Sequence, residues 1–160
     1  MSLVDDRHPL LRTWLFGPGA DSAVHEAMSA SGANVLILDL EDSTPPPLRD
    51  QARALAAGLF GRWRMTGARV CVRINSLHED GPLDLAHVVP AKPDFVAYPK
   101  AATASDMREL DRAIAALEAQ AGLAPGSIGI LPVCETALGV VNAQSMGSGL
   151  AMMHLPGCKT

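Results

Sequence analysis

Short apolar segments recur along the chain, and each ends in polar, charged or backbone-exposing residues. The clearest segment is 35–38, where four consecutive aliphatic residues are too few for a globular helix and indicate a strand buried on both faces. Similar strands are predicted at 13–16, 70–72, 95–98 and 128–134. Three acids crowd the end of the 35–38 strand, which indicates that this strand delivers polar groups to a solvated edge.

Helical patterns separate the predicted strands. Asp21 is placed to cap a helix that ends near Ser31, and Gly32 suits its C-terminal stop. Further helices are expected after the prolines at 45–47, at 83–89 behind a turn at 80–82, and at about 106–120. The apolar stripes of these helices are Ala23, Val24, Ala27 and Met28; Leu48, Ala52, Leu55, Ala56 and Leu59; and Met107, Leu110, Ile114 and Leu117.

The alternation of strand and helix predicts an α/β fold with parallel strands and right-handed crossovers. Parallel sheets and barrels both place their active sites at the carboxyl ends of the strands. A complete eight-stranded barrel needs about 250 residues, so a chain of 160 reaches only five or six units. The tail from Gln144 has no charged residue before Lys159 and does not repeat the unit; a helix through Met153 is the element expected there.

Composition narrows the function classes. A formal net charge of −4 without a basic run argues against a nucleic-acid partner. No apolar run is long enough to span a bilayer, and residues 1–8 carry no apolar secretory core. Cys71, Cys134 and Cys158 are scattered, which indicates a reducing compartment and not a disulfide framework. We therefore expect a cytoplasmic protein without a membrane partner.

Two side chains stand out at predicted strand ends. Glu135 closes the strand at 128–134, where a carboxylate suits a cation or a substrate; the alternative is a cap for the following helix. Arg73 leaves the strand at 70–72, where its guanidinium can fork onto a substrate carboxylate. An internal ion pair between Arg73 and the acids of the neighbouring strand is the alternative, and both can hold at once.

The remaining candidates are harder to separate. Alternation puts Asp39 and Glu41 on one face and Asp42 on the other, and at least one of them is expected to support Arg73 or cap a helix. Lys100 could form a Schiff base with a carbonyl substrate or act as a charge partner at the edge of the sheet. The histidines lack the spacing of a zinc hydrolase, no nucleophile elbow occurs, and Gly17-Pro18-Gly19 is not a dinucleotide fingerprint.

At these residues the chain resembles the HpcH/HpaI aldolase and citrate lyase β-subunit family, which includes malyl-CoA and citramalyl-CoA lyases. The similar stretches follow the family's order and lie at 12–19 (RTWLFGPG), 38–43 (LDLEDS), 72–75 (VRIN), 98–100 (YPK) and 134–136 (CET). Any one stretch is weak, but all of them in order are specific. The resemblance implies the first five β/α units of a TIM-type (β/α)₈ barrel over residues 1–143, followed by a divergent tail at 144–160.

The resemblance also implies a chemistry. Such enzymes cleave or form a carbon–carbon bond of a hydroxy acid or its CoA thioester through an enolate stabilised by Mg²⁺ or Mn²⁺. Arg73 matches the arginine that grips a substrate carboxylate, and Glu135 matches the first metal ligand beside the substrate. Arg12 and Lys100 are expected near the substrate, with Asp39, Glu41 and Asp42 in supporting positions.

The chain departs from the family pattern after Glu135. The second metal ligand is an aspartate in a Gly-x-x-Asp-Leu type of segment, and no Asp or Glu follows Glu135 here. We expect the tail to be a frameshifted or prematurely ended continuation. The alternatives to a lyase are a catalytically inactive remnant or ligand-binding half-barrel, and Schiff-base chemistry at Lys100. We expect a homo-oligomer or a partner that completes the barrel.

Overall fold

The computed structural model describes residues 11–150, which form a five-stranded parallel sheet in the order β1-β2-β3-β4-β5. The elements are β1 (Trp14–Pro18), α1 (Ser22–Ala30), β2 (Val35–Asp39), η1 (Pro46–Leu48), α2 (Arg49–Met65), β3 (Arg69–Arg73), α3 (Gly81–Val88), η2 (Val89–Ala91), β4 (Phe95–Tyr98), α4 (Ala104–Gln120), β5 (Gly129–Pro132) and α5 (Ala137–Leu150). The predicted α/β fold with parallel strands is confirmed: this is the N-terminal part of a TIM-type barrel, and it is incomplete.

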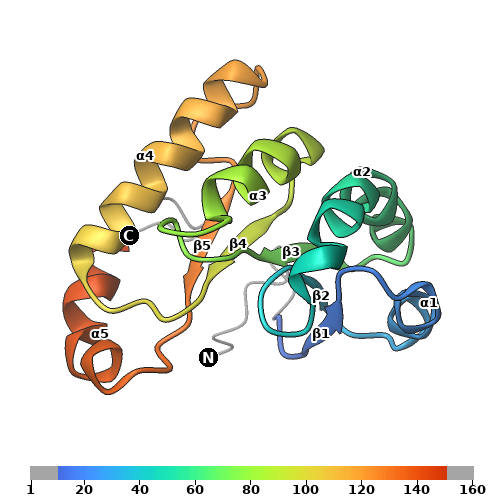
Figure 1. Ribbon diagram of the computed structural model, residues 1–160, viewed down its shortest axis with the longest axis horizontal. Coiled ribbons are helices and arrows are strands. Elements are labelled where there is room, and N and C mark those ends of the chain that lie inside the picture. Colours follow the sequence, from blue (N-terminus) through green and yellow to red (C-terminus); the bar gives the residue numbers. More distant parts are fainter. Residues whose placement is uncertain (1–10, 151–160) are drawn as a thin grey trace, which may run out of the picture.

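The two faces of the sheet have different partners. Figure 1 shows the helices in an arc around the sheet, with α1 and α2 at one end and α4 and α5 at the other. The face toward the helices carries the larger apolar core, which includes Leu36, Val70 and Val96. The opposite face carries a smaller cluster that includes Ile37 and Cys71. Both faces of β2 are buried, as its run of aliphatic residues predicts.

Helix α1 begins and ends as predicted. The Asp21 carboxylate accepts a hydrogen bond from the Val24 amide, and Gly32 follows the helix in a left-handed conformation with φ of 73°. The predicted apolar side of the helix is buried only in part, because Ala23 and Ala27 are exposed. Helix α1 is buried at Met28 and His25, and the ring of His25 lies edge-on to Trp63 of α2.

The apolar stripe predicted for α2 is also buried only in part. Ala52, Ala56 and Leu59 are buried as expected, but Leu48 and Leu55 remain 41% and 39% exposed. The buried face extends further along the helix, through Arg53, Phe60 and Trp63. A pattern of apolar residues could not include Arg53, since it is charged. Its burial is made possible by ion pairs with Asp50 of α2 and with Asp80 and Asp84 at the start of α3.

Several element boundaries differ from the sequence prediction, among them those of β1, α3 and β5. Strand β1 continues through Gly17 and Pro18, which lie opposite Leu38 and Asp39 of β2. Gly17 is needed there, because a Cβ atom would come within 2.2 Å of Met28 Sδ. Helix α3 begins at Gly81 and so includes part of the predicted turn at 80–82. Strand β5 is shorter than predicted and spans Gly129–Pro132.

The sheet is open within residues 11–150, since β1 pairs only with β2 and β5 pairs only with β4. Beyond β5, α5 runs across the predicted domain boundary at residue 143, and that division stays a prediction. The end of the predicted helix through Met153, like Cys158, lies outside the described residues. Among the helices of the described part, none is long and apolar enough to cross a membrane.

The open sheet and α5 generate a prediction about self-association. Leu138, Val140 and Val141 of α5 are 55%, 63% and 79% exposed, so three aliphatic side chains meet solvent within four positions. Open strand edges and exposed apolar patches favour association. We expect the wild-type chain to self-associate and bind ANS, and Val141→Lys to reduce both, as measured by light scattering and ANS fluorescence.

Met65→Lys is the matched control for Val141→Lys, because Met65 is 82% exposed but stands at the far end of α2. The lysine at Met65 should leave the association unchanged. A monodisperse wild-type monomer that binds no ANS would contradict the prediction.

Candidate functional site at the carboxyl ends of the strands

An arginine and an aspartate join the carboxyl ends of β2 and β3. Arg73 donates from Nε to Asp39 Oδ1 at 2.7 Å and from Nη2 to Asp39 Oδ2 at 2.6 Å, a bidentate arrangement. The two residues lie opposite each other in the parallel register. The Asp39 side chain is 1% exposed and the Arg73 side chain 13%. The arginine therefore reaches the surface of the site, while the aspartate that binds it is buried.

Two further acids approach the same guanidinium. Glu41 Oε2 lies 3.1 Å from Arg73 Nη1, close enough for an ion pair but not aligned for a hydrogen bond. Asp42 lies 3.7 Å from Nη1 and is 66% exposed. The predicted alternation of faces does not extend to these acids, because β2 ends at Asp39. The internal ion-pair interpretation of Arg73 is therefore confirmed.

Lys100 follows β4 and makes two contacts through different atoms, one to the loop after β5 and one to the loop after β2. Its backbone amide donates to Glu135 Oε1 at 2.9 Å, and its ammonium donates to Glu41 Oε1 at 2.8 Å. The backbone of Lys100 has φ of 50°, a left-handed conformation that is uncommon for a residue with a side chain. Glu135 does not cap α5, because the Thr136 hydroxyl accepts the hydrogen bond from the Gly139 amide instead.

The ion pairs shift the pKa of three groups. Burial raises the pKa of Asp39, but hydrogen bonds from Arg73, Ser43 and the Glu41 amide outweigh burial and hold the pKa below its usual range. The hydrogen bonds to Asp39 raise the pKa of Arg73. The hydrogen bond to Glu41 raises the pKa of Lys100, so its ammonium stays protonated at neutral pH.

Of the acids that the family resemblance connects with a metal, the described residues contain one, Glu135. Within residues 11–150, no group of three or more His, Cys, Asp or Glu side chains could hold a metal ion. Glu41 is occupied by Arg73 and Lys100. Glu135 is exposed. Within the described part of the chain its carboxylate accepts a hydrogen bond from Lys100 through Oε1, which leaves Oε2 for a cation. Carboxylate oxygen is a ligand that Mg²⁺ accepts, with water completing the shell.

The structure brings together most of the predicted site residues but not all of them. Asp39, Glu41, Asp42, Arg73, Lys100 and Glu135 are connected by the contacts above. Arg12 lies elsewhere: it precedes the first residue of β1, at the amino end of the strands, where its amide donates to Asn34 Oδ1. The substrate-binding role expected for Arg12 stays a prediction, and its position in the structure does not support it.

Sequence reasoning missed Phe16. Its ring lies 5.1 Å from the guanidinium carbon of Arg73 and is 45% exposed, so it covers one face of the guanidinium with a cation–π contact. Alternation along β1 puts Phe16 on the same face as Trp14, but the sequence gives no sign of its contact with Arg73. The Asp39 carboxylate holds one edge of Arg73 and Phe16 one face. Glu41 and Asp42 lie near the Nη1 end of the same guanidinium.

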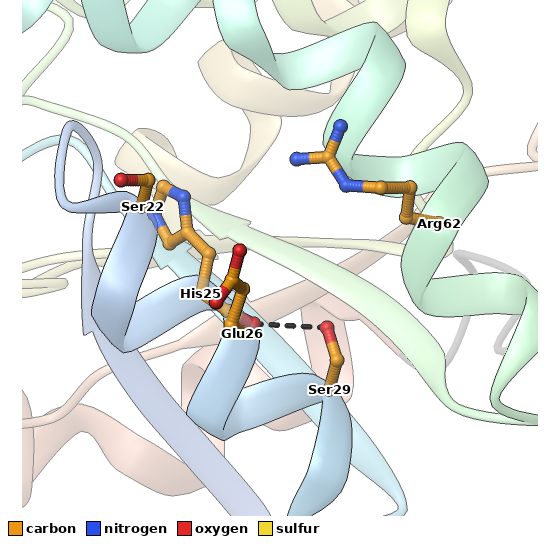
Figure 2. Close-up of a pocket in the computed structure, with 5 residues that line it drawn as sticks. All are labelled: Ser22, His25, Glu26, Ser29 and Arg62. Carbon is orange, nitrogen blue, oxygen red and sulfur yellow. Dashed lines mark hydrogen bonds between the residues drawn. The ribbon is translucent and has the colours of Figure 1, made fainter.

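A pocket of about 430 Å³ lies between the first two helices and is lined by none of the predicted site residues. Figure 2 shows Ser22, His25, Glu26 and Ser29 on α1 facing Arg62 on α2. The His25 ring is hydrogen-bonded to the Pro18 carbonyl at 2.7 Å, which ties α1 to the end of β1. The pocket pairs one acid with one arginine, so its charges favour no single class of ligand.

The sequence matches the HpcH/HpaI aldolase/citrate lyase family over residues 12–153. It is 34% identical over 133 residues to the citrate lyase subunit beta of Escherichia coli, covering 82% of this chain and 44% of that protein. It is 33% identical over 155 residues to the L-malyl-CoA/beta-methylmalyl-CoA lyase of Cereibacter sphaeroides, covering 88% of this chain and 48% of that protein. The chain thus spans about half the length of these relatives.

Solved structures agree with the sequence match. The protein CitE of Mycobacterium tuberculosis in complex with magnesium and acetoacetate superposes with a TM-score of 0.64 at 28% identity, covering 89% of this chain and 53% of that one. A malate synthase of Haloferax volcanii superposes with a TM-score of 0.73 at 18% identity, covering 96% of this chain and 50% of that one. At that identity the second likeness shows the fold alone.

The geometry of Arg73 and Asp39 generates a stability prediction. Asp39→Asn removes the charge that Arg73 needs and should lower the free energy of unfolding at pH 7 by about 3–5 kcal/mol. Because the pKa of Asp39 is lowered by folding, its contribution is present above about pH 4, the unfolded value, and is lost as the pH falls through the lower folded pKa. The difference between Asp39→Asn and wild type should therefore narrow in acid. Urea unfolding at neutral and acid pH measures it.

The control for Asp39→Asn is Asp42→Asn, which removes an acid from the same guanidinium. Asp42 is 66% exposed and lies 3.7 Å away, so its loss should cost less than about 1 kcal/mol. Equal losses of stability in the two variants would show that Asp39 is no more important to Arg73 than a solvated neighbour.

Proposed function

The chain belongs to the HpcH/HpaI aldolase/citrate lyase family, and we propose that it is a carbon–carbon lyase that cleaves a hydroxy acid or its CoA thioester. The observation that carries the proposal is Arg73, whose guanidinium is fixed by Asp39 and still reaches the surface of the site. The site lies where the carboxyl ends of β2, β3, β4 and β5 meet, the edge that parallel α/β folds use for catalysis.

Arg73 binds the carboxylate of the substrate with the donors that Asp39 leaves uncommitted. Asp39 fixes the plane of the guanidinium, and the ring of Phe16 covers one face of it, so a carboxylate approaches in one orientation. A planar donor that is held in place loses little side-chain entropy when the ligand binds. Glu41 and Asp42 lie close to Nη1, so the substrate carboxylate competes with them for this nitrogen.

Glu135 would hold a divalent cation, Mg²⁺ or Mn²⁺, with water and substrate oxygens as the other ligands. When bound there, the cation supplies electrostatic stabilisation of the negative charge that develops on the substrate. The amide of Lys100 orients the Glu135 carboxylate, and Arg73 holds the substrate carboxylate nearby. In the reaction the substrate hydroxyl loses its proton and becomes a carbonyl as the carbon–carbon bond breaks. The bonding pair stays with the other fragment as an enolate, which takes up one proton at carbon, so that in sum one proton moves from oxygen to carbon.

A ligand-binding half-barrel without catalysis is the second candidate. The observation that favours it is that residues 11–150 offer a cation one carboxylate and no cluster of three ligands. The chain also spans about half of the relatives, of which one is named as a subunit. A second copy or another chain that completes the barrel would then supply what the described residues lack. The cytoplasmic location and the absence of a nucleic-acid partner stay predictions from the sequence.

The lyase proposal is tested with L-malyl-CoA and Mg²⁺, following acetyl-CoA release by liquid chromatography. We expect cleavage by the wild type, a loss of about a hundredfold or more in kcat/KM in Arg73→Lys, because lysine lacks the fork, and a comparable loss in Glu135→Gln. Chelation of the divalent cation should abolish the activity.

The controls use residues of the same type away from the site. Arg69→Lys changes an arginine at the amino end of the same strand, where it pairs with Asp94, and Glu109→Gln changes an exposed acid on α4. Both should keep wild-type kinetics. A wild type that binds pyruvate but cleaves no malyl-CoA would favour the half-barrel, and cleavage unaffected by Arg73→Lys would remove Arg73 from the site.

Lys100 offers a separate test, because a Schiff base needs an unprotonated amine. The hydrogen bond to Glu41 raises the pKa of Lys100, so at neutral pH the amine is held as an ammonium that cannot attack a carbonyl. We expect borohydride treatment with pyruvate to leave no adduct on Lys100 in a peptide map by mass spectrometry. An adduct at Lys100 above the level on the exposed Lys92 would support the imine mechanism instead.

A further inference from the structure

We propose that Asp84 and Asn75 are positioning residues for the Arg73 site, and that they act through the peptide groups of Leu40. Asp84 belongs to α3, on the helix layer, and Asn75 follows β3. Their effect on Arg73 is a property of the free protein. The further effect on ligand binding rests on the proposed function.

Asp84 is a buried carboxylate whose two oxygens are both occupied. Its side chain is 0% exposed. Its Oδ1 accepts a hydrogen bond from Arg53 Nε at 2.7 Å. Its Oδ2 accepts two from Asn75, from the amide at 2.7 Å and from the side-chain nitrogen at 2.8 Å. Buried charges persist in proteins when paired and hydrogen-bonded, and Asp84 meets both conditions.

Asn75 connects Asp84 to Leu40, the residue that follows β2. Its side-chain nitrogen also donates to the Leu40 carbonyl at 2.9 Å. The Leu40 amide in turn donates to the Arg73 carbonyl at 2.9 Å. Both backbone polar groups of Leu40 are therefore held by residues at the end of β3 or just beyond it.

Leu40 stands between the two acids that contact Arg73. Asp39 precedes it and binds the guanidinium through both oxygens, while Glu41 follows it and lies 3.1 Å from Nη1. A shift of the Leu40 peptides would move both carboxylates relative to Arg73. The path from Asp84 to Arg73 is thus a chain of contacts with no gap.

The charge of Asp84, and not only its shape, maintains the path. Both Asp84 oxygens face donors: Arg53 on one side and Asn75 on the other. Asp84→Asn has nearly the same volume but turns one acceptor into a donor, which would face another donor in a buried place. Either Arg53 or Asn75 must then move, and a movement of Asn75 would reach the site because Asn75 is hydrogen-bonded to Leu40.

A purely structural role is the competing explanation, and Glu118 provides the matched control for it. Glu118 is also a buried helical acid, 1% exposed, and it accepts hydrogen bonds from Gly126, Ser127 and Ile128. Those partners precede β5, at the opposite end of the strands from Arg73. Glu118→Gln should destabilise the fold without changing the geometry of Arg73.

The experiment follows the Arg73 Nε–H resonance in the full ¹⁵N-labelled chain, assigned by its loss in Arg73→Lys. In the wild type the bidentate contact with Asp39 slows exchange of this proton with solvent. We expect Asp84→Asn to speed the exchange by roughly tenfold, the scale of a weakened charged hydrogen bond. Glu118→Gln should leave it within about twofold of wild type, as for a distant independent site.

Asn75→Ala provides a second route if Asp84→Asn does not fold, because it removes the donor to Leu40 and leaves the Asp84–Arg53 pair in place. It should speed the exchange to the same extent. The double variant should exchange no faster than either single variant, because both act on one path.

Unchanged exchange in both single variants would overturn the proposal, as would an equal increase in Glu118→Gln. Calorimetric titration with pyruvate separates this outcome from the proposed function. If pyruvate does not bind the wild type, the proposed carboxylate site fails while the exchange rates still decide the positioning role. If pyruvate binds, Asp84→Asn should raise its Kd and Glu118→Gln should not.

Discussion

The bidentate pair between Arg73 and Asp39 is the interaction on which the organisation of the site depends. It joins neighbouring strands at the point where both end, and it commits one edge of the guanidinium to the protein. Removal of either charge would leave the other poorly solvated at the edge of the core. The other groups of the site are placed around this pair: Phe16 against its face, Glu41 at its far end, and Lys100 beyond Glu41.

The parallel sheet explains why residues far apart in the chain meet here. Asp39, Arg73, Lys100 and Glu135 each come at or just after the end of a strand. Parallel strands in one sheet bring their carboxyl ends to one edge. Residues spread over nearly a hundred sequence positions can therefore meet there, each on the strand end or on the loop that follows it. The buried network of α2 and α3 then supports the same edge from the helix side.

Much of this could be predicted from the sequence, because each signal was local. A run of four aliphatic residues is enough to indicate the buried strand β2, and acids after it indicate a polar edge. Phe16, Asn75 and Asp84 could not be found this way. Their importance comes from contacts with residues 9 to 57 positions away, and the local sequence gives no sign of such a partner. Arg53 was missed for the same reason, since a charged residue in a helix is expected to face water.

Lys100 has a left-handed backbone, and its main chain and its side chain serve two different contacts. Its main chain anchors Glu135 through an N–H group that every residue except proline carries, while its ammonium contacts Glu41. The anchor therefore does not depend on which side chain occupies the position. Selection could replace the lysine by glycine, which adopts this conformation without strain. The orientation of Glu135 would be kept, while Glu41 would lose the positive charge beside it. Over evolutionary time, the electrostatic character of the site can drift at position 100 without disturbing the carboxylate beside it.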